Sequence, residues 1–466
     1  MKEKKIGIFT LAVSLILLGG IFLLNNFIDI NVYHILSIAW PVFIILLGLE
    51  IVFSRILFGS KDGRISISGK SVFFIILIVC ITCFFSVFDR FPLYIDMGGD
   101  FLPIAYKNET TVNKDMTIET KGKKKLKIIN GFGDVNVKKG DIKDIKVDMM
   151  VSMKHNYEEE EAQKIASNML EVINDSGDTI KMINKRDKYT ANNEVNNLEV
   201  NLDITIPYDM ELDITNKYGE IMVNDCSNLA VISNKHGNIF IDTIKGDVDI
   251  KNSYGEVEIK NIDGNVNVEN KHGKVFANNV TKDMDIDVEY GKIKVNEIGG
   301  NVEITNVHET IEAEKIGKNL TIESRYCRID IDGIKGDLNI NGKHGNILGK
   351  KIDGGVKVTN EYGSIKVTET NKAIDIRNKH GQIIFESDKV ISEKLEIENQ
   401  YDRIDIRLPN NQEGKFHVYS KHGRIGSDFD LNIDKDNSEE IINQSIGNKS
   451  VSIDIKATNG DIRIDN

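Results

Sequence analysis

Tyrosine and histidine alternate through the second half of the chain, with one or the other at every eighteenth position. Histidine is the residue of this row that is most able to do chemistry. Neutral imidazole binds transition metals and titrates near neutral pH, so the row first suggests a metal site or a pH response. The row consists of Tyr218, His236, Tyr254, His272, Tyr290, His308, Tyr326, His344, Tyr362 and His380.

The spacing argues against a shared metal. If each repeat unit forms one layer of a stack, successive histidines lie two layers apart, at about 9.6 Å. A metal ion needs ligand nitrogens within about 2.1 Å, so rings at that separation cannot hold one ion together. We therefore expect a structural ladder of stacked rings with no metal and no cofactor. A weak pH response of the histidines remains the alternative.

Carboxylates are the other candidates for chemistry. The calcium-binding pattern G-G-x-G-x-D is absent from the sequence. Acidic residues are spread over every predicted outward face, and no nucleophile with a base, or acid with a base, stands out as a constellation. We therefore predict that the protein is not an enzyme and has no catalytic residues.

A row of apolar residues interrupts the polar outward surface. Four residues after each ladder histidine the chain carries Phe240, Phe276, Leu348 and Ile384, although Glu312 breaks the row. One interpretation is a discontinuous stripe that binds a partner. The other is a set of scattered exposed side chains, which are normal on protein surfaces.

One repeat unit shows which elements must carry these residues. In residues 264–280, Val266 and Val268 alternate with polar residues, as in a half-buried strand. The run Asn270–Gly273 breaks the alternation at a corner where glycine allows a positive φ, and Val275 with Ala277 resumes it. Each unit, or rung, therefore holds two short strands.

Short strand pairs bury an apolar face only when identical rungs stack. No proline occurs from Met210 to Leu408, as expected if nearly every backbone N–H donates to a neighbouring strand. Asparagine stands two residues before most rings and can hydrogen-bond along the stack. The sequence thus predicts an all-β parallel β-solenoid. Looser copies at Tyr401 and His422 bring the total to twelve rungs and a rod of about 58 Å.

The first 90 residues differ sharply from the rest. Residues 6–24, 35–53 and 71–88 are apolar, and each stretch approaches the ~20 residues that span a bilayer. Lysines and arginines lie before the first stretch and between the second and third. This distribution predicts three transmembrane α-helices through residues 6–88 of a bacterial cell membrane, a cytoplasmic N-terminus and an extracellular C-terminal domain. Glu50, an intramembrane acid in this interpretation, is either functional or merely close to the end of its span.

Charge and composition suggest four parts. The net charge of −12 combines +3 in residues 1–90 with −15 in the remainder, which argues against a nucleic-acid partner. We predict a three-helix transmembrane anchor over 1–90, then an extracellular linker and mixed capping region over 91–206 that contains a helix at 157–173. The regular solenoid follows over 207–430, and an irregular insertion with the last rung occupies 431–466.

Two stretches resemble known families. Leu-Gly-Gly-Ile-Phe-Leu-Leu at 18–24 and Trp-Pro-Val-Phe-Ile-Ile-Leu-Leu-Gly at 40–48 resemble the LiaI/LiaF-like transmembrane module of bacterial envelope proteins. Residues 120–466 resemble the bacterial putative-adhesin family of β-strand-repeat proteins, a domain of unknown function. That second resemblance rests on the run 202–207, the Asn-Lys-Tyr/His-Gly corners and the closing run 458–464.

These observations leave two functions open. The first is a non-enzymatic, membrane-anchored extracytoplasmic scaffold, adhesin-like, that binds a cell-wall, glycan or protein partner on the solenoid face at the bacterial cell surface. The alternative, implied by the LiaF-like resemblance, is a regulatory membrane protein of cell-envelope stress signalling whose helices contact a membrane sensor protein.

Overall fold

The computed structural model describes residues 108–466 except 175–176, 191–194 and 228–229. Before these it describes only 4–6, 9–14, 16, 45–46, 48–50, 52–53, 65–67 and 106. Backbone contacts divide the chain into two compact units, Met1–Pro103 and Ile104–Asn466.

In the first unit, β1 (Lys4–Ile6) pairs in parallel with β2 (Ile65–Ile67). The Glu50 carboxylate accepts hydrogen bonds from the backbone N–H of Thr10 at 2.9 Å and from its hydroxyl at 2.5 Å. Thr10 lies in the first turn of a helical segment described over residues 9–14. A carboxylate at this place accepts hydrogen bonds from backbone N–H groups that have no partner within the helix. The structure thus shows Glu50 as a hydrogen-bond acceptor for Thr10.

The prediction of three transmembrane helices is contradicted. None of the helices in the described residues is long and apolar enough to cross a membrane. The predicted span 71–88 lies entirely outside the described residues, as does most of 6–24 and 35–53. The multi-pass localisation that rested on these spans is withdrawn with them, because apolar composition alone does not ensure one continuous helix.

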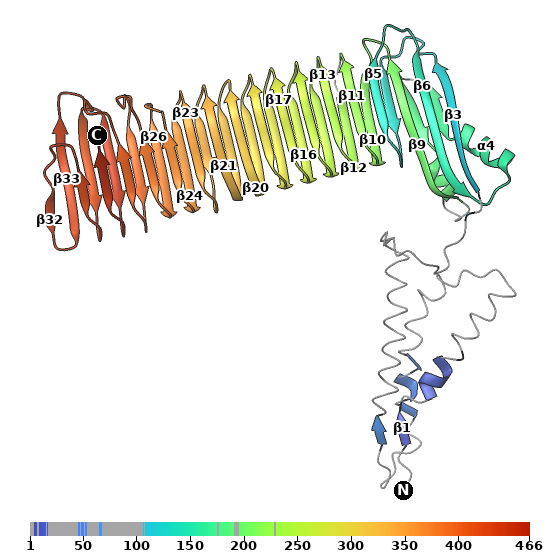
Figure 1. The fold of residues 1–466 in the computed structure, drawn as a ribbon, viewed down its shortest axis with the longest axis horizontal. Helices are drawn as coiled ribbons and strands as arrows, with labels where there is room; N and C mark the ends of the chain where they lie inside the picture. Colours follow the sequence, from blue (N-terminus) through green and yellow to red (C-terminus); the bar gives the residue numbers. More distant parts are fainter. Residues whose placement is uncertain are drawn as a thin grey trace. The chain divides into compact units, whose positions relative to one another are not determined.

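The second unit contains a parallel β-solenoid, as the repeat period predicts (Figure 1). Each rung has two strands, and each strand pairs in parallel with its counterpart on the next rung, as in Val266↔Met284 and Val275↔Ile293. The eleven successive rungs are built from β10 (Glu211–Tyr218), β11 (Ile221–Cys226), β12 (Ala230–His236), β13 (Ile239–Ile244), β14 (Val248–Tyr254), β15 (Val257–Ile262), β16 (Val266–His272), β17 (Val275–Val280), β18 (Met284–Tyr290), β19 (Ile293–Ile298), β20 (Val302–Ile316), β21 (Leu320–Ile334), β22 (Leu338–Asn341), β23 (Ile347–Ile352), β24 (Val356–Tyr362), β25 (Ile365–Thr368), β26 (Ile374–His380), β27 (Ile383–Glu386), β28 (Leu395–Asn399) and β29 (Ile404–Arg407).

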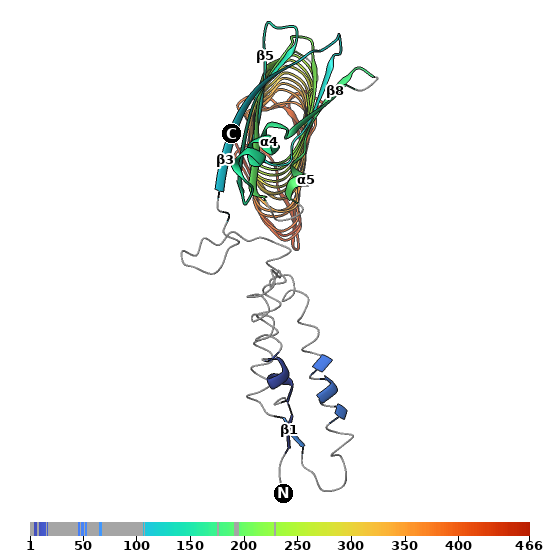
Figure 2. The ribbon, with the colours of Figure 1, turned by 90° about the vertical axis from the view of Figure 1, so that its right-hand side faces the viewer.

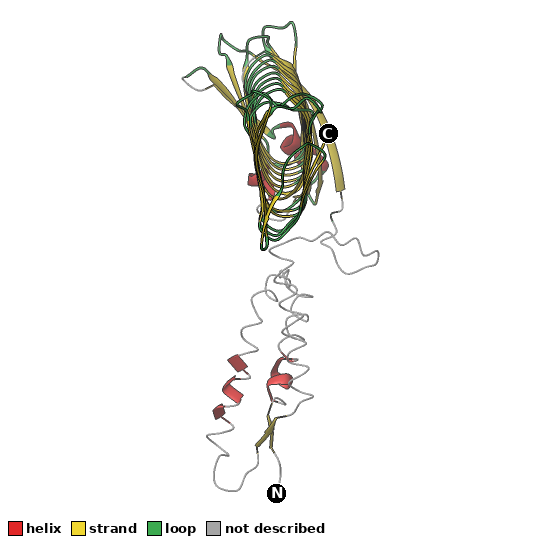
Figure 3. Ribbon diagram, turned by 90° about the vertical axis from the view of Figure 1, so that its left-hand side faces the viewer, coloured by secondary structure: helices red, strands yellow, loops and turns green. Residues whose placement is uncertain are grey.

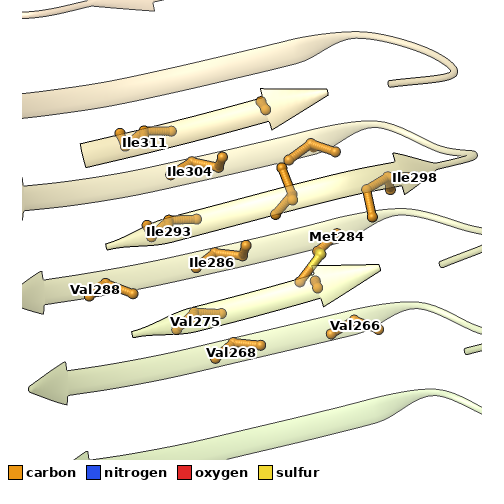
Figure 4. Close-up of a cluster of buried hydrophobic side chains, with 14 of the residues drawn as sticks. Val266, Val268, Val275, Met284, Ile286, Val288, Ile293, Ile298, Ile304 and Ile311 are labelled. Carbon is orange, nitrogen blue, oxygen red and sulfur yellow. The ribbon is translucent and has the colours of Figure 1, made fainter. Parts of the chain in front are cut away.

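The core is a narrow apolar layer between the two strand faces. Val268, Ile286 and Ile304 are fully buried and follow one another on successive rungs (Figure 4). Seen along the rod, the strands form two long faces and the loops form two edges (Figure 3). The alternation of the sequence thus buries one side of every strand and leaves the other side polar.

Rungs at both ends are inserted out of sequence order. At the N-terminal end, β4 (Lys125–Ile129) and β5 (Val135–Lys139) lie between β10–β11 and the outer pair β8 (Thr179–Asn184) and β9 (Val195–Ile206). At the other end, β34 (Ser452–Ala457) and β35 (Ile462–Asp465) lie between β28–β29 and the outer pair β30 (Gly414–Ser420) and β31 (Ile425–Ser427). The last rung in sequence is therefore not the last in space, contrary to the predicted order.

Antiparallel strands cover both ends of the rod, and two short helices add to the cover at the N-terminal end. At the N-terminal end, β3 (Asn108–Ile118) pairs with β6 (Ile145–His155), β6 pairs with β9, and α4 (Glu159–Ser167) and α5 (Arg186–Thr190) lie across the end of the rod (Figure 2). At the C-terminal end, β33 (Glu439–Ile446) pairs with β30 and with β32 (Asp434–Asp436). These pairings occupy edges that would otherwise offer unpaired backbone groups to another chain.

The predicted helix over 157–173 is only partly present. Helix α4 ends at Ser167 and buries Ala162 and Ala166. After it, β7 (Leu170–Asn174) forms an antiparallel pair with β8. The apolar spacing of Met169–Ile173 fitted a helix, but sheet pairing with β8 supplies the backbone hydrogen bonds of that segment instead.

Candidate functional site

The structure stacks the tyrosine and histidine rings into one continuous row along a corner of the rod. Ten successive ring pairs from Tyr218 to Tyr401 have centroids 4.5–5.1 Å apart and ring planes within 3–10° of parallel. Phe132 of the inserted N-terminal rung adds a tilted ring 5.8 Å from Tyr218. His422 lies on the outer rung β30–β31, beyond the inserted rung β34–β35, and is not next to Tyr401.

Glycine shapes the corner that carries each ring. In seven of the rungs, the glycine that follows the ring has φ between 110° and 137°, a region closed to residues with a side chain. At Gly237, for example, a Cβ would overlap the carbonyl group of Gly219 one rung back. Where Glu309 and Cys327 replace the glycine, β20 and β21 run through the corner as single long strands.

A buried asparagine row holds the corners together beneath the rings. These side chains are only 0–5% exposed, and each donates Nδ2–H to the glycine carbonyl of the preceding rung at 2.8–3.3 Å. Several donate a second bond within their own corner, as Asn270 does to Gly273 at 3.2 Å. The row consists of Asn216, Asn234, Asn252, Asn270, Asn306, Asn360, Asn378 and Asn399.

The rings present their edges to solvent. The six tyrosines are 41–55% exposed, whereas the five histidines between them are half-buried. Because the faces of neighbouring rings cover one another, the outward surface consists of phenol hydroxyls and imidazole edges. We name this surface the aromatic ridge. It comprises the eleven corners from Lys217–Glu220 to Gln400–Arg403.

The ladder histidines do not converge on a metal. A tyrosine ring lies between each successive pair, as Tyr254 does between His236 and His272 at 4.8 and 4.9 Å. Within the described part of the chain, no three His, Cys, Asp or Glu side chains are grouped so that they could hold an ion. The arrangement offers a repeated array of hydrogen-bonding edges rather than a coordination site.

The four residues of the predicted discontinuous apolar stripe do not adjoin one another in the structure. Phe240 and Phe276 lie on alternate rungs with Glu258 between them in register. Lys294, Glu312 and Asp330 separate Phe276 from Leu348. Lys366 then separates Leu348 from Ile384. Each apolar side chain therefore has a charged neighbour on at least one side, so the structure does not bring the four together into one patch.

The cysteines of the solenoid are not arranged as nucleophiles. Cys226 and Cys327 are buried free thiols. Burial raises the pKa of Cys226 to about 12 and that of Cys327 to about 11. Both thiols therefore stay protonated and poorly reactive at neutral pH.

Two features of the ridge were not anticipated from the sequence. Phe132 lies outside the eighteen-residue period, and its ring contact with Tyr218 arises only because β4 and β5 stack on β10 and β11. The second is the net charge of the residues that flank the rings, of which the Asn-Lys-Tyr/His-Gly corners show only the lysines on one side.

The fold and the ridge define the chain as a β-solenoid repeat protein. Residues 280–465 match the family model described as Toastrack DUF4097. This match supports the predicted likeness to a β-repeat, adhesin-like family, whereas no finding supports the LiaI/LiaF-like module. Among curated proteins, none matches the chain.

Two further likenesses are weaker. One solved structure is described as a putative cell adhesion protein from Clostridium sporogenes ATCC 15579. It is 11% identical, has a TM-score of 0.19, and the match covers 76% of this chain and 99% of that one. Residues 201–268 match the model of the Hermes transposase DNA-binding domain. That segment holds 12 acidic and 5 basic residues and forms strands of the solenoid, so it lacks the positive charge that phosphate contacts require.

Proposed function

We propose that this protein is a non-enzymatic binding scaffold of the adhesin-like kind, in which the solenoid presents one long face to a partner. The observation that carries this proposal is the aromatic ridge. Its ten ring spacings of 4.5–5.1 Å make a row about 48 Å long. Such a row repeats the same weak contact many times, and repeated contacts give avidity without a deep pocket.

Rigidity supports this role. Glycine corners, buried asparagines and stacked rings hold the exposed edges in register, so little side-chain freedom is lost when a partner binds. The buried, protonated thiols and the dispersed carboxylates provide no evident catalytic machinery, which is consistent with binding rather than turnover.

Cosedimentation with purified bacterial cell walls tests the proposal. The full chain is expected to pellet with the walls in a saturable way. A variant that lacks residues 255–290 joins Tyr254 to Gly291, keeps the ring alternation and is shorter by two rungs. This variant should fold and bind more weakly. Failure of the full chain to cosediment with the walls would refute the proposal.

A further inference from the structure

The aromatic ridge is positively charged, although the protein as a whole carries −12. Its eleven corners contain ten basic and six acidic residues. The basic residues are Lys217, Lys235, Lys271, Lys274, Lys292, Arg325, Arg328, Lys343, Lys379 and Arg403, and the acidic ones are Glu220, Glu256, Glu289, Glu309, Glu361 and Asp402. The ridge is thus a basic line on an acidic rod, which is the arrangement expected for electrostatic attraction of an anion.

Half of these cations are free to contact a partner. In the described part of the chain, no ion pair or side-chain hydrogen bond involves Lys235, Lys271, Lys274, Arg325 or Lys343, all of which are exposed. Other ridge cations are already paired, as Lys217 is with Asp187 at 3.0 Å, Lys292 with Glu312 at 2.5 Å and Arg328 with Asp330 at 2.9 Å. Four of these free cations lie in the part of the ridge that runs from the His272 corner to the His344 corner. They are Lys271, Lys274, Arg325 and Lys343.

The geometry of the rings favours one kind of anion. Proteins bind single-stranded nucleic acids by stacking bases on open aromatic faces. Here the faces are covered by neighbouring rings, whose planes are within 3–10° of parallel, so only the ring edges remain. Tyrosine hydroxyls and imidazole nitrogens at these edges are donors and acceptors that match sugar hydroxyls.

We propose that the aromatic ridge binds a linear anionic glycan. The ring edges hydrogen-bond to the sugars, while Lys271, Lys274, Arg325 and Lys343 pair with the carboxylate, sulfate or phosphate groups along the polymer. This proposal rests on the binding function proposed above and names the chemical class of the partner.

Polygalacturonate, a linear carboxylate glycan, is a suitable probe, and its fully methyl-esterified form is the matched neutral control. Binding to the full chain is measured by fluorescence anisotropy. The ridge variant carries K271Q, K274Q, R325Q and K343Q. The control variant carries K282Q, K318Q, K357Q and K389Q, which remove four lysines outside the ridge that are likewise exposed and unpaired.

We expect the charged glycan to bind and the esterified form to bind at least about tenfold more weakly. The ridge variant should lose about tenfold or more in affinity, whereas the control variant should change by less than about twofold. For four contacts, affinity should fall on the order of 100-fold between about 50 and 200 mM salt. Polyphosphate and single-stranded DNA, tested in parallel, show whether charge alone suffices.

Three outcomes would overturn the glycan proposal: equal losses in both variants, equal binding of the esterified glycan, or equally tight binding of single-stranded DNA or polyphosphate. These outcomes are distinguishable from failure of the scaffold function. If the ridge variant still cosediments with cell walls as the unmodified chain does, the scaffold proposal stands and these four cations do not contribute to that binding.

Discussion

The buried asparagine row offers the sharpest test of what holds the corners in place. Asn270 is 2% exposed, and its Nδ2 donates to the carbonyls of Gly255 at 3.1 Å and Gly273 at 3.2 Å. Because each such bond contributes about 1 kcal/mol net, removing both in Asn270→Ala should lower the free energy of unfolding by about 2–3 kcal/mol once the lost packing is included. Asn270→Val should cost less, since Val288 occupies this row one rung further on.

Asn270→Asp removes the hydrogen-bond donor of the side chain while keeping almost the same side-chain shape. Aspartate has almost the size of asparagine, but when ionised it donates nothing and places a buried negative charge beside two carbonyl oxygens. We therefore expect a cost of about 4 kcal/mol at pH 7. Burial raises the pKa of this new carboxyl, so lowering the pH protonates it, restores a donor and reduces the difference from the unmodified chain.

The assay is urea unfolding followed by circular dichroism, with hydrogen exchange of a peptide that covers residues 264–280 to localise the effect. Asn339→Asp is the matched control, because Asn339 is exposed and faces outward on β22. It should change stability by less than about 0.5 kcal/mol. If Asn270→Asp were as stable as the unmodified chain at pH 7, the asparagine row would not act through its donors.

Three further perturbations test other parts of the corner. Gly237→Ala should cost at least about 2 kcal/mol in urea unfolding, because φ is 137° and the new Cβ overlaps the carbonyl group of Gly219. Thr243→Asn should stabilise by about 1 kcal/mol in the same assay, since Thr243 has φ of 59° and asparagine tolerates that conformation better. The pKa of His236 is lowered, first by burial and then by Lys235, so Lys235→Gln should raise it in an NMR titration. Because this pKa lies below its unfolded value, the stability that depends on it is present above pH ~6.5 and decreases as the pH falls. A His236 pKa that does not move in the variant would contradict the assigned role of Lys235.

The regular part of the solenoid follows directly from the sequence, and the reason is geometric. In a parallel stack, each residue has as its neighbour the residue one period away, so a constant spacing in sequence becomes a ring contact in space. The ring row, the asparagine row and the glycine corners are therefore visible as periodic positions in the amino-acid sequence itself.

The ends of the rod do not follow from the same rule. The insertion of β4–β5 and of β34–β35 between rungs depends on which strand edge is free when each segment docks, and the period says nothing about that. The shortening of the predicted helix to Glu159–Ser167 has the same origin, since the edge of β8 competes for the residues that follow. The prediction of three membrane-spanning helices failed for a different reason: it rested on hydropathy alone, and none of the helices in the described residues is long and apolar enough to cross a membrane.

The second corner of each rung has a backbone conformation that the sequence does not predict. Asp225, Thr243, Asn261, Asn279 and Glu297 occupy the same position on five successive rungs and all have φ between 53° and 60°, yet only Asn261 and Asn279 are the same residue type. Packing between rungs imposes this backbone conformation on threonine and glutamate as well as on asparagine and aspartate, so no single residue type marks the position. The sequence by itself determined the period, the two strands per rung and the residues that stack. The tertiary structure alone decided how the rod ends, which cations on the ridge remain unpaired and where the backbone is strained, because each of these depends on contacts between segments that no period relates.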